Sequence, residues 1–217
     1  MGETLIKYDD QMKATPWLAS SWKQSDDKLS WTFKINDKVK FSNGNPLTAE
    51  AVKSSLERTF AKNNRAKTFF NYTEITANGQ EFTIKTDKPY YNLPSLLGDP
   101  LFLIVDVTSE ANGRNFAKEG PIGTGPYVVE SFTKERAELK RNDNYWDGKV
   151  GFSRVEISSI NDANTRAMAL QSGDVDMAIG IGPGEYGIFQ NDKNFTIYEV
   201  ASLRDVFVRM SQKGKLS

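Results

Sequence analysis

An arginine followed closely by aromatic residues is the pattern in this sequence whose chemistry is easiest to name. Arg65 lies in the polar stretch KNNRAK, and Phe69, Phe70 and Tyr72 follow it. A guanidinium offers a planar fork of N–H donors for a carboxylate, and neighbouring rings provide a wall for stacking. The four residues are therefore a candidate site for an anionic ligand. A basic loop beside a buried phenylalanine pair would give the same pattern, and the residues alone leave both interpretations open.

A glycine-rich stretch, GPIGTGPY at residues 120–127, is the second candidate for chemistry. Backbone amides between glycines can bind oxyanions. A phosphate-binding loop, however, needs Gly-Lys-Ser or Gly-Lys-Thr after its last glycine, and this chain has Pro126 and Tyr127 there. We therefore expect a structural turn, which its prolines stiffen and in which glycine permits a close backbone approach.

The acidic residues offer neither a calcium loop nor an acid-base pair. In the segment that begins at Asp143, Tyr145 stands where a calcium loop needs an oxygen ligand, and Arg154 replaces the bidentate glutamate. Asp174 and Asp176 would lie on one face of a strand, where exposure to solvent or helix capping suits them better than catalysis. We expect no catalytic residue, no metal site and no cofactor.

Composition excludes several classes of function. The chain has 217 residues with no cysteine and no histidine, which removes disulfides, zinc sites and Ser-His-Asp or Cys-His catalysis. Lys and Arg together number 28, as do Asp and Glu, so we expect no nucleic-acid partner. The first residues show no positive segment followed by an apolar run, so we expect a cytoplasmic protein or one whose leader has been removed.

Periodicity and capping signals predict the elements that position these residues. Residues 30–41 alternate in the manner of a strand, with Trp31, Phe33 and Ile35 on one face. Thr48 is typical of an N-cap, and the apolar stripe after it predicts a helix that ends near Ala61.

Turn signals predict two hairpins and one mixed segment. Asn78-Gly79 has the composition of a two-residue hairpin turn, and residues 133–136 are expected to connect a second pair of strands. The apolar residues 90–107 are expected to form a short helix followed by a strand.

The last third of the chain predicts a strand, a helix and a strand, which together make a βαβ unit. The first strand covers residues 155–160, and the helix lies between Asp162 as its N-cap and Gly173 as its C-cap. Ala163, Ala167 and Leu170 would form its buried side, and residues 175–179 would begin the next strand. Further strands are expected near residues 195–200 and 206–210.

Five segments of the chain, in order, resemble the family 5 solute-binding proteins of peptide and nickel ABC importers. They are residues 16–44 (PWLASSW to KFSNG), 46–52 (PLTAEAV), 121–127 (PIGTGPY), 141–146 (RNDNYW) and 165–176 (TR with GDVD). Because the segments extend over nearly the whole chain and keep their order, coincidence is a poor explanation.

The resemblance implies a protein that captures a solute and catalyses nothing. The solute would be a nickel chelate or a short peptide, held in the periplasm or outside the cell by a membrane-associated protein that delivers it to an ABC permease. The stretches PWLA and SNG are closest to the nickel-binding branch. In that comparison Arg65 corresponds to a ligand-binding arginine, and Phe69 lies near an aromatic wall position. Asp99 stands where a second arginine is expected before Pro100.

The resemblance also implies an α/β fold: a periplasmic-binding-protein-like lobe of class II, of the peptide and nickel type, with an inserted α+β subdomain. Residues 1–44 and 121–217 would form the core of lobe I, and residues 45–120 the insertion. The second lobe would be missing, so we expect a truncated chain with weak or no binding. Two alternatives remain: an interaction domain that self-associates through the exposed half-interface and, less favoured, a carboxylate-dependent hydrolase.

Overall fold

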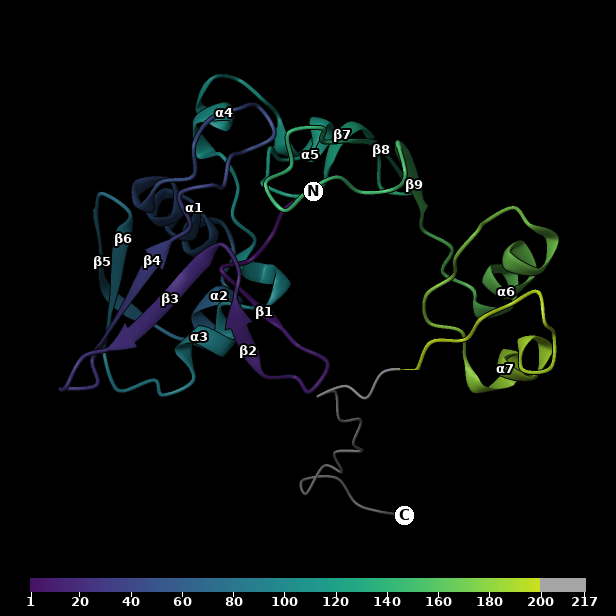
Figure 1. Ribbon diagram of the computed structural model, residues 1–217, viewed down its shortest axis with the longest axis horizontal. Helices are drawn as coiled ribbons and strands as arrows, with labels where there is room; N and C mark the ends of the chain where they lie inside the picture. The colour runs from purple at the N-terminus through teal and green to yellow at the C-terminus, as the bar shows by residue number, and fades with distance from the viewer. Residues whose placement is uncertain (200–217) are drawn as a thin grey trace, which may run out of the picture. The chain divides into compact units, whose positions relative to one another are not determined.

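The computed structural model describes residues 1–199 of the chain, which fall into two compact units (Figure 1). The first unit is Met1–Ile160 and contains two larger sheets, and the second begins at Asn161 and contains two helices. Among residues 1–199, none of the helices combines the length and the hydropathy that a transmembrane span requires.

A four-stranded antiparallel sheet is the centre of the first unit. Its order is β3-β4-β6-β5, and its strands are β3 (Ala19–Gln24), β4 (Ser30–Ile35), β5 (Tyr72–Asn78) and β6 (Glu81–Thr86). The predicted strand is confirmed in β4, where Trp31, Phe33 and Ile35 are buried. It ends earlier than expected because the Asn36 side chain accepts a hydrogen bond from the amide of Lys38 and turns the chain.

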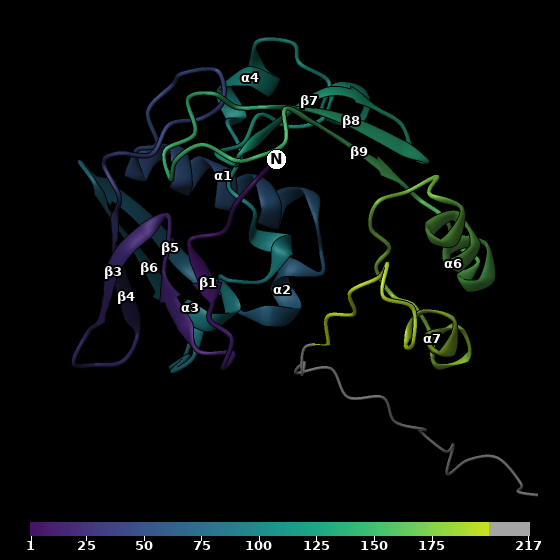
Figure 2. The same cartoon turned by 45° about the vertical axis from the view of Figure 1, so that its right-hand side comes forward.

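Helix α1 (Ala49–Lys62) packs against β5 and β6 (Figure 2). Thr48 caps it, because the Thr48 hydroxyl accepts a hydrogen bond from the amide of Ala51 at 3.2 Å. Leu56 and Phe60 lie on the buried side of the helix. The predicted helix and its cap are therefore confirmed.

Both predicted hairpins are present. Gly79 has φ of +60° in the turn between β5 and β6, a conformation that glycine adopts without strain. The second hairpin joins β7 (Tyr127–Phe132) to β8 (Arg136–Arg141), and β9 (Arg154–Ser158) completes a three-stranded antiparallel sheet of order β7-β8-β9. Thr133 Oγ1 closes this turn by accepting a hydrogen bond from the amide of Arg136 at 3.0 Å.

Short elements make up the rest of the first unit. They are β1 (Ile6–Tyr8), β2 (Ala14–Pro16), α2 (Ala66–Phe69), α3 (Leu93–Leu96), the 3₁₀ helix η1 (Pro100–Phe102), α4 (Val107–Ala111) and α5 (Phe116–Glu119). The short helix expected within residues 90–107 is present, but the strand expected after it is wrong. Ile104 and Val105 form only single bridges, because Asp106 then caps α4 and turns the chain into that helix.

One hydrophobic core joins parts of the chain that the sequence assigned to different segments. It extends from Leu5 to Ile104. In the main sheet, β3 and β4 precede residue 45, whereas β5 and β6 follow it. The division into residues 1–44, 45–120 and 121–217 stays a prediction about the larger family fold.

The second unit contains α6 (Ala163–Ser172) and α7 (Pro183–Phe189). Both predicted caps of α6 are confirmed: the Asp162 side chain accepts a backbone hydrogen bond from the first turn, and Gly173 has φ of +81°. Of the side chains expected to be buried, Ala167 is buried, whereas Ala163 and Leu170 are only partly so.

The predicted βαβ unit is wrong, because no strand follows α6 within the described residues. Residues 175–179 are irregular, and the side chains of Met177 and Ile179 are 73% and 78% exposed. A strand needs a neighbour for its backbone hydrogen bonds, and residues 161–199 supply none. The strand expected near residues 195–200 is absent over 195–199, and the one near 206–210 lies outside the described residues.

Candidate functional site

Arg65 and Phe69 lie together at the surface of the first unit. The Asn63 side chain accepts a hydrogen bond from the amide of Arg65 and so holds the turn that precedes α2. The guanidinium carbon of Arg65 lies 5.7 Å from the centre of the Phe69 ring. The Arg65 side chain is exposed, and among residues 1–199 it makes no hydrogen bond or ion pair. Within the described residues, the Phe69 ring is therefore the contact of this charge, and no carboxylate neutralises it.

The other two predicted site residues lie behind this surface. Phe70 is 1% exposed and meets the rings of Phe60 and Phe102 in the core. Tyr72 is half-buried, with its ring edge-on to Phe60 at 4.9 Å, and burial followed by the charge of Glu57 raises the pKa of its hydroxyl. Of the four predicted residues, Arg65 and Phe69 are therefore at the surface, whereas Phe70 and Tyr72 pack against Phe60 of α1.

Sequence reasoning missed a contact between β1 and the segment that leads into η1. Asp99 Oδ1 accepts a hydrogen bond from the amide of Leu101 at 2.8 Å and caps η1. The Tyr8 hydroxyl donates to the carbonyl of Ser95. Burial, and then the charge of Asp99, raises the pKa of Tyr8. The Tyr8 ring packs against the residue before Asp99, since a Cβ on Gly98 would lie 3.0 Å from Tyr8 Cε2. No local signal connects Tyr8 with Asp99, because they are far apart in the chain.

The motifs that carry the family resemblance converge on one carboxylate, that of Glu3. Its Oε1 accepts hydrogen bonds from Trp17 Nε1 at 2.9 Å and from the Tyr145 hydroxyl at 2.6 Å. Its Oε2 accepts from the Thr124 hydroxyl at 2.8 Å and from Trp146 Nε1 at 3.1 Å. Burial, and then the hydrogen bond to Glu3, raises the pKa of Tyr145. These motif residues therefore hold the fold together.

The glycine-rich turn of residues 120–127 is structural, as expected. A Cβ on Gly123 would lie 2.5 Å from the carbonyl oxygen of Met1, and one on Gly125 would lie 2.7 Å from it. The amide of Gly125 donates a hydrogen bond to that same carbonyl at 2.9 Å. The two glycines are therefore needed because the first residues of the chain pass directly against the turn.

The SNG motif of residues 42–44 also has a structural role, because its Asn43 binds a buried aspartate, Asp106. Asp106 is 4% exposed, and its Oδ2 accepts hydrogen bonds from the side-chain amides of Asn43 at 2.7 Å and Asn45 at 2.9 Å. Burial raises the pKa of Asp106, but hydrogen bonds from Thr108, Asn43 and Asn45 outweigh it and hold the pKa below its usual range. Asp106 is therefore a satisfied structural carboxylate.

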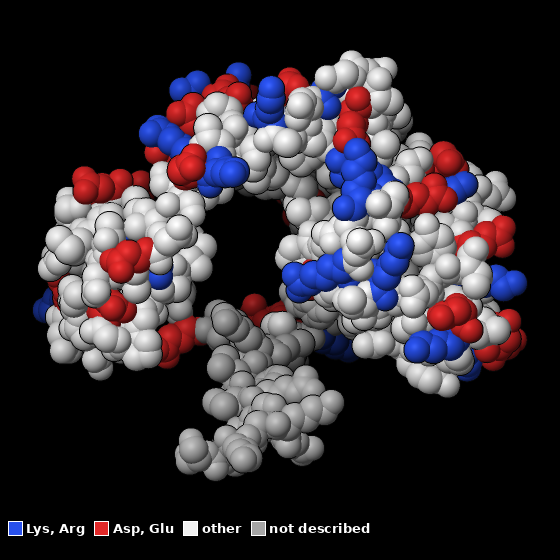
Figure 3. Space-filling model, turned by 180° about the vertical axis from the view of Figure 1, so that it is seen from behind, with Lys and Arg blue, Asp and Glu red and all other residues white. Residues whose placement is uncertain are grey.

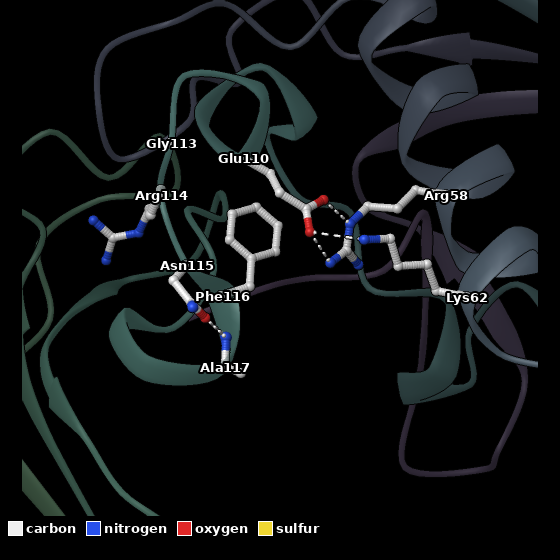
Figure 4. Close-up of a pocket in the computed structure, with 8 residues that line it drawn as sticks. All are labelled: Arg58, Lys62, Glu110, Gly113, Arg114, Asn115, Phe116 and Ala117. Atoms are coloured by element: carbon white, nitrogen blue, oxygen red, sulfur yellow. Dashed lines mark hydrogen bonds and ion pairs between the residues drawn. The ribbon is translucent and has the colours of Figure 1, made fainter.

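A hollow of about 450 Å³ lies between α1, α4 and α5 (Figure 4). Its charged side chains already have partners. Glu110 accepts hydrogen bonds from Arg58 Nη2 at 3.0 Å and Lys62 Nζ at 3.1 Å, and Arg114 donates to the carbonyls of Glu119 and Gly120. Figure 4 shows the Glu110 carboxylate directed at Arg58 and Lys62, while Arg114 points away from them. We therefore interpret this group as a contact between helices.

The Glu110 contact predicts a pH dependence of stability. Hydrogen bonding, above all from Arg58, outweighs burial and lowers the pKa of Glu110 from 4.5 to about 2. Because the folded pKa lies below the unfolded one, the contact stabilises the fold above pH 4.5 and is lost as the pH falls toward 2. Glu110→Gln should lower the free energy of unfolding by about 1 kcal/mol at pH 7, a difference that narrows below pH 4.5.

Urea unfolding between pH 7 and pH 3 measures this effect. Glu50→Gln is the matched control, because Glu50 forms an ion pair with Lys53 at 3.8 Å in which its own side chain is 66% exposed. We expect the control to change stability little at any pH. The prediction would be contradicted if the free energies of unfolding of wild type and Glu110→Gln differed by the same amount at pH 7 and pH 3.

The described residues contain no group of three or more acidic side chains that could hold a metal ion.

The sequence of this chain matches a known protein family. The family described as bacterial extracellular solute-binding proteins, family 5 Middle, matches residues 13–216. The chain belongs to this family. Its members are periplasmic or extracellular binding proteins of ABC importers.

Individual family members are similar over most of the chain. The nickel-binding protein NikA of Staphylococcus aureus is 30% identical over 214 residues, which cover 98% of this chain and 43% of NikA. The probable D,D-dipeptide-binding periplasmic protein DdpA of Escherichia coli is 31% identical over 203 residues, 89% of this chain and 39% of DdpA. The chain therefore spans less than half the length of the family members that it matches.

Solved structures of the family confirm the predicted fold class. NikA of Staphylococcus aureus in complex with Ni(L-His)₂ matches with a TM-score of 0.83 and 32% identity, over 89% of this chain and 41% of that one. The nickel ABC transporter structure from Bacillus halodurans matches with a TM-score of 0.81 and 36% identity, over 88% and 40%. The α/β lobe expected from the resemblance is therefore the fold of this chain.

Proposed function

We propose that this chain is part of a solute-binding protein that captures a nickel chelate or a short peptide and delivers it to an ABC permease. Arg65 and Phe69 contact the solute, and Phe70 and Tyr72 support them from the core. The observation that carries this proposal is the exposed Arg65 guanidinium, which has no hydrogen bond or ion pair among the described residues and lies over an aromatic ring. Such a group is available for a carboxylate.

The names of the family members agree with a carboxylate-bearing solute. The Staphylococcus aureus structure holds Ni(L-His)₂, and the Escherichia coli relative is named for D,D-dipeptides. Histidine and dipeptides both carry a carboxylate, the group that a guanidinium binds best. We propose that the solute is bound without chemical change, in the periplasm or outside the cell, by a membrane-associated protein.

The surface charge favours a small solute over a nucleic acid. The chain has no net charge. On the face of the first unit that Figure 3 shows, positive and negative side chains lie beside one another. Nucleic-acid binding needs an extended positive surface, so any charge recognition is local to single side chains such as Arg65.

We propose that this chain alone binds its solute weakly. Arg65 is exposed, so water competes for its N–H groups and screens its charge. Solute-binding sites gain affinity by enclosing most of the ligand surface, and an open wall encloses little of it. A dissociation constant on the order of 1 mM is therefore expected.

Amide NMR of the ¹⁵N-labelled chain tests the proposal. The probes are Ni(L-His)₂, D-alanyl-D-alanine and glutathione, each added up to about 20 mM to exceed the expected dissociation constant. At least one probe should change the amide signals of Arg65 and Phe69, and Arg65→Ala should abolish the change. Arg154→Ala is the matched control, since Arg154 is an exposed arginine paired with Glu130 at 3.1 Å, and it should bind as wild type does.

The outcomes of this titration test the proposed site, the expected affinity and the alternative of self-association. Absence of any change near Arg65 with all three probes would reject the proposed site. Micromolar affinity would leave the site standing but contradict the expectation of weak binding. Spectra recorded at two protein concentrations test the alternative of self-association, because line widths that grow with concentration would indicate dimers.

A further inference from the structure

We propose that Asn78 is a modification site, at which the folded chain loses a side-chain amide and gains a carboxylate. The sequence places a glycine directly after an asparagine three times, at Asn43, Asn78 and Asn112. In such a pair the backbone nitrogen of the glycine can attack the side-chain amide of the asparagine, because glycine has no Cβ to obstruct a close approach. The structure leaves this reaction open at Asn78 and obstructs it at the other two asparagines. The modification is independent of the solute that the chain binds.

The reaction needs water as its only co-reactant. The Gly79 nitrogen forms a bond to Cγ of Asn78, the bond from Cγ to the side-chain nitrogen breaks, and ammonia leaves with the proton of the Gly79 amide. The product is a five-membered succinimide ring. Water then opens the ring at either carbonyl, which gives aspartate or isoaspartate without any oxidation or reduction. A free side-chain amide and a free glycine nitrogen are therefore the two structural requirements.

Both requirements are met at the turn between β5 and β6. Asn78 is the last residue of β5 and is exposed, and its side chain makes no hydrogen bond among residues 1–199. The amide of Gly79 donates no hydrogen bond within this range either. A Cβ on Gly79 would meet nothing within 4 Å, so there is open space beside the glycine. The side-chain amide and the attacking nitrogen can therefore approach each other without breaking a hydrogen bond.

Hydrogen bonds obstruct the same reaction at Asn43. Its side-chain nitrogen donates to Asp106 Oδ2 at 2.7 Å, and its side-chain oxygen accepts from the amide of Asn45 at 3.2 Å. The amide of Gly44 donates to the carbonyl of Phe41 at 2.9 Å. Attack at Asn43 would separate both groups from these partners, so neither requirement is met.

At Asn112 one of the two requirements fails. The Asn112 side chain is exposed and makes no hydrogen bond in the described part of the chain. The amide of Gly113, however, donates to the carbonyl of Glu110 at 3.0 Å, and the amide of Asn112 donates to that of Thr108 at 2.9 Å. These two bonds hold the backbone around the glycine nitrogen at the end of α4. Asn112 should therefore react more slowly than Asn78 and faster than Asn43.

The modification changes the charges across the hairpin. Asn78 pairs with Glu81 in the register of β5 and β6. An aspartate at position 78 would place two carboxylates directly opposite each other, and like charges in this arrangement destabilise a sheet. Isoaspartate would also add one carbon atom to the main chain beside the turn. Asn78→Asp should therefore unfold at a lower urea concentration than the uncharged variant Asn78→Ser.

Peptide mapping by mass spectrometry, after storage of the chain at neutral pH, tests the proposal. In the folded chain, Asn78 should convert about tenfold faster than Asn112, since the hydrogen bond of Gly113 must break first, and Asn43 should convert slowest. In urea that unfolds the chain, all three should convert at similar rates, because the hydrogen bonds that distinguish them are lost. An isoaspartate-specific methyltransferase with labelled S-adenosylmethionine distinguishes the two products.

Variants assign the signal to one residue. Asn78→Ser should abolish the fast conversion, whereas Asn112→Ser, the matched control, should leave it unchanged. The proposal is wrong if Asn112 or Asn43 converts as fast as Asn78 in the folded chain. It is also wrong if Asn78 stays unmodified in the folded chain over the time in which the chain in urea is converted.

Discussion

Glu3→Ala is expected to lower the free energy of unfolding by about 3 kcal/mol. The Glu3 carboxylate accepts four hydrogen bonds, from Trp17, Thr124, Tyr145 and Trp146. Its removal leaves two indole N–H groups and two hydroxyls without their acceptor in a partly buried site. Unsatisfied buried donors cost about 1–3 kcal/mol each, and entering water recovers part of that cost.

A graded series sharpens this test. Glu3→Gln keeps Oε1, the acceptor for Trp17 and Tyr145, but places an NH₂ group where Trp146 donates. It should cost about half as much as the alanine variant. Glu57→Ala is the matched control on the exposed side of α1. Urea unfolding measures all three, and a Glu3→Ala variant within about 0.5 kcal/mol of the control would show that the four hydrogen bonds contribute little.

Gly123→Ala should destabilise the chain by about 2–4 kcal/mol, because its new methyl group meets backbone atoms that cannot rotate away. The added Cβ would lie 2.5 Å from the Met1 carbonyl oxygen and 2.8 Å from Gly2 Cα. Gly125→Ala should act in the same direction, since its Cβ would lie 2.7 Å from the same oxygen. The steric clash is relieved only if the first residues of the chain move away from the turn.

Thermal or urea unfolding, combined with amide exchange, checks this prediction. The matched control is Gly151→Ala, because a Cβ there meets nothing within 4 Å and the backbone conformation is ordinary. If the first residues move, the amide of Gly125 loses its acceptor on Met1 and should exchange faster. Unchanged stability and unchanged protection of that amide in Gly123→Ala would contradict the prediction.

Local sequence patterns predicted part of the candidate site and missed the rest. Arg65 is the N-cap of α2, and Phe69, four positions later, is the last residue of that helix, so their contact follows from local geometry. Phe70 and Tyr72 were predicted to belong to the same ligand wall. Their positions depend on Phe60, on the neighbouring α1, and no local pattern indicates which rings α1 will cover.

The errors in the last third of the chain have a related cause. The alternation of Val175, Met177 and Ile179 is typical of a strand, but a strand is stable only beside a partner. The helix before it was predicted well because Asp162 and Gly173 act on backbone groups within one turn.

Caps, turn glycines and alternation were readable from the printed residues because each acts over a few positions, and the order of the family motifs was enough to name the fold. Which contacts the motif residues make was decided only by the tertiary structure. Tyr145 reaches Glu3 across 142 residues of chain, and the Tyr8 hydroxyl reaches the carbonyl of Ser95 across 87 residues. Hydrogen bonds and ring contacts between such distant residues depend on the packed core, whose geometry no short window of sequence contains.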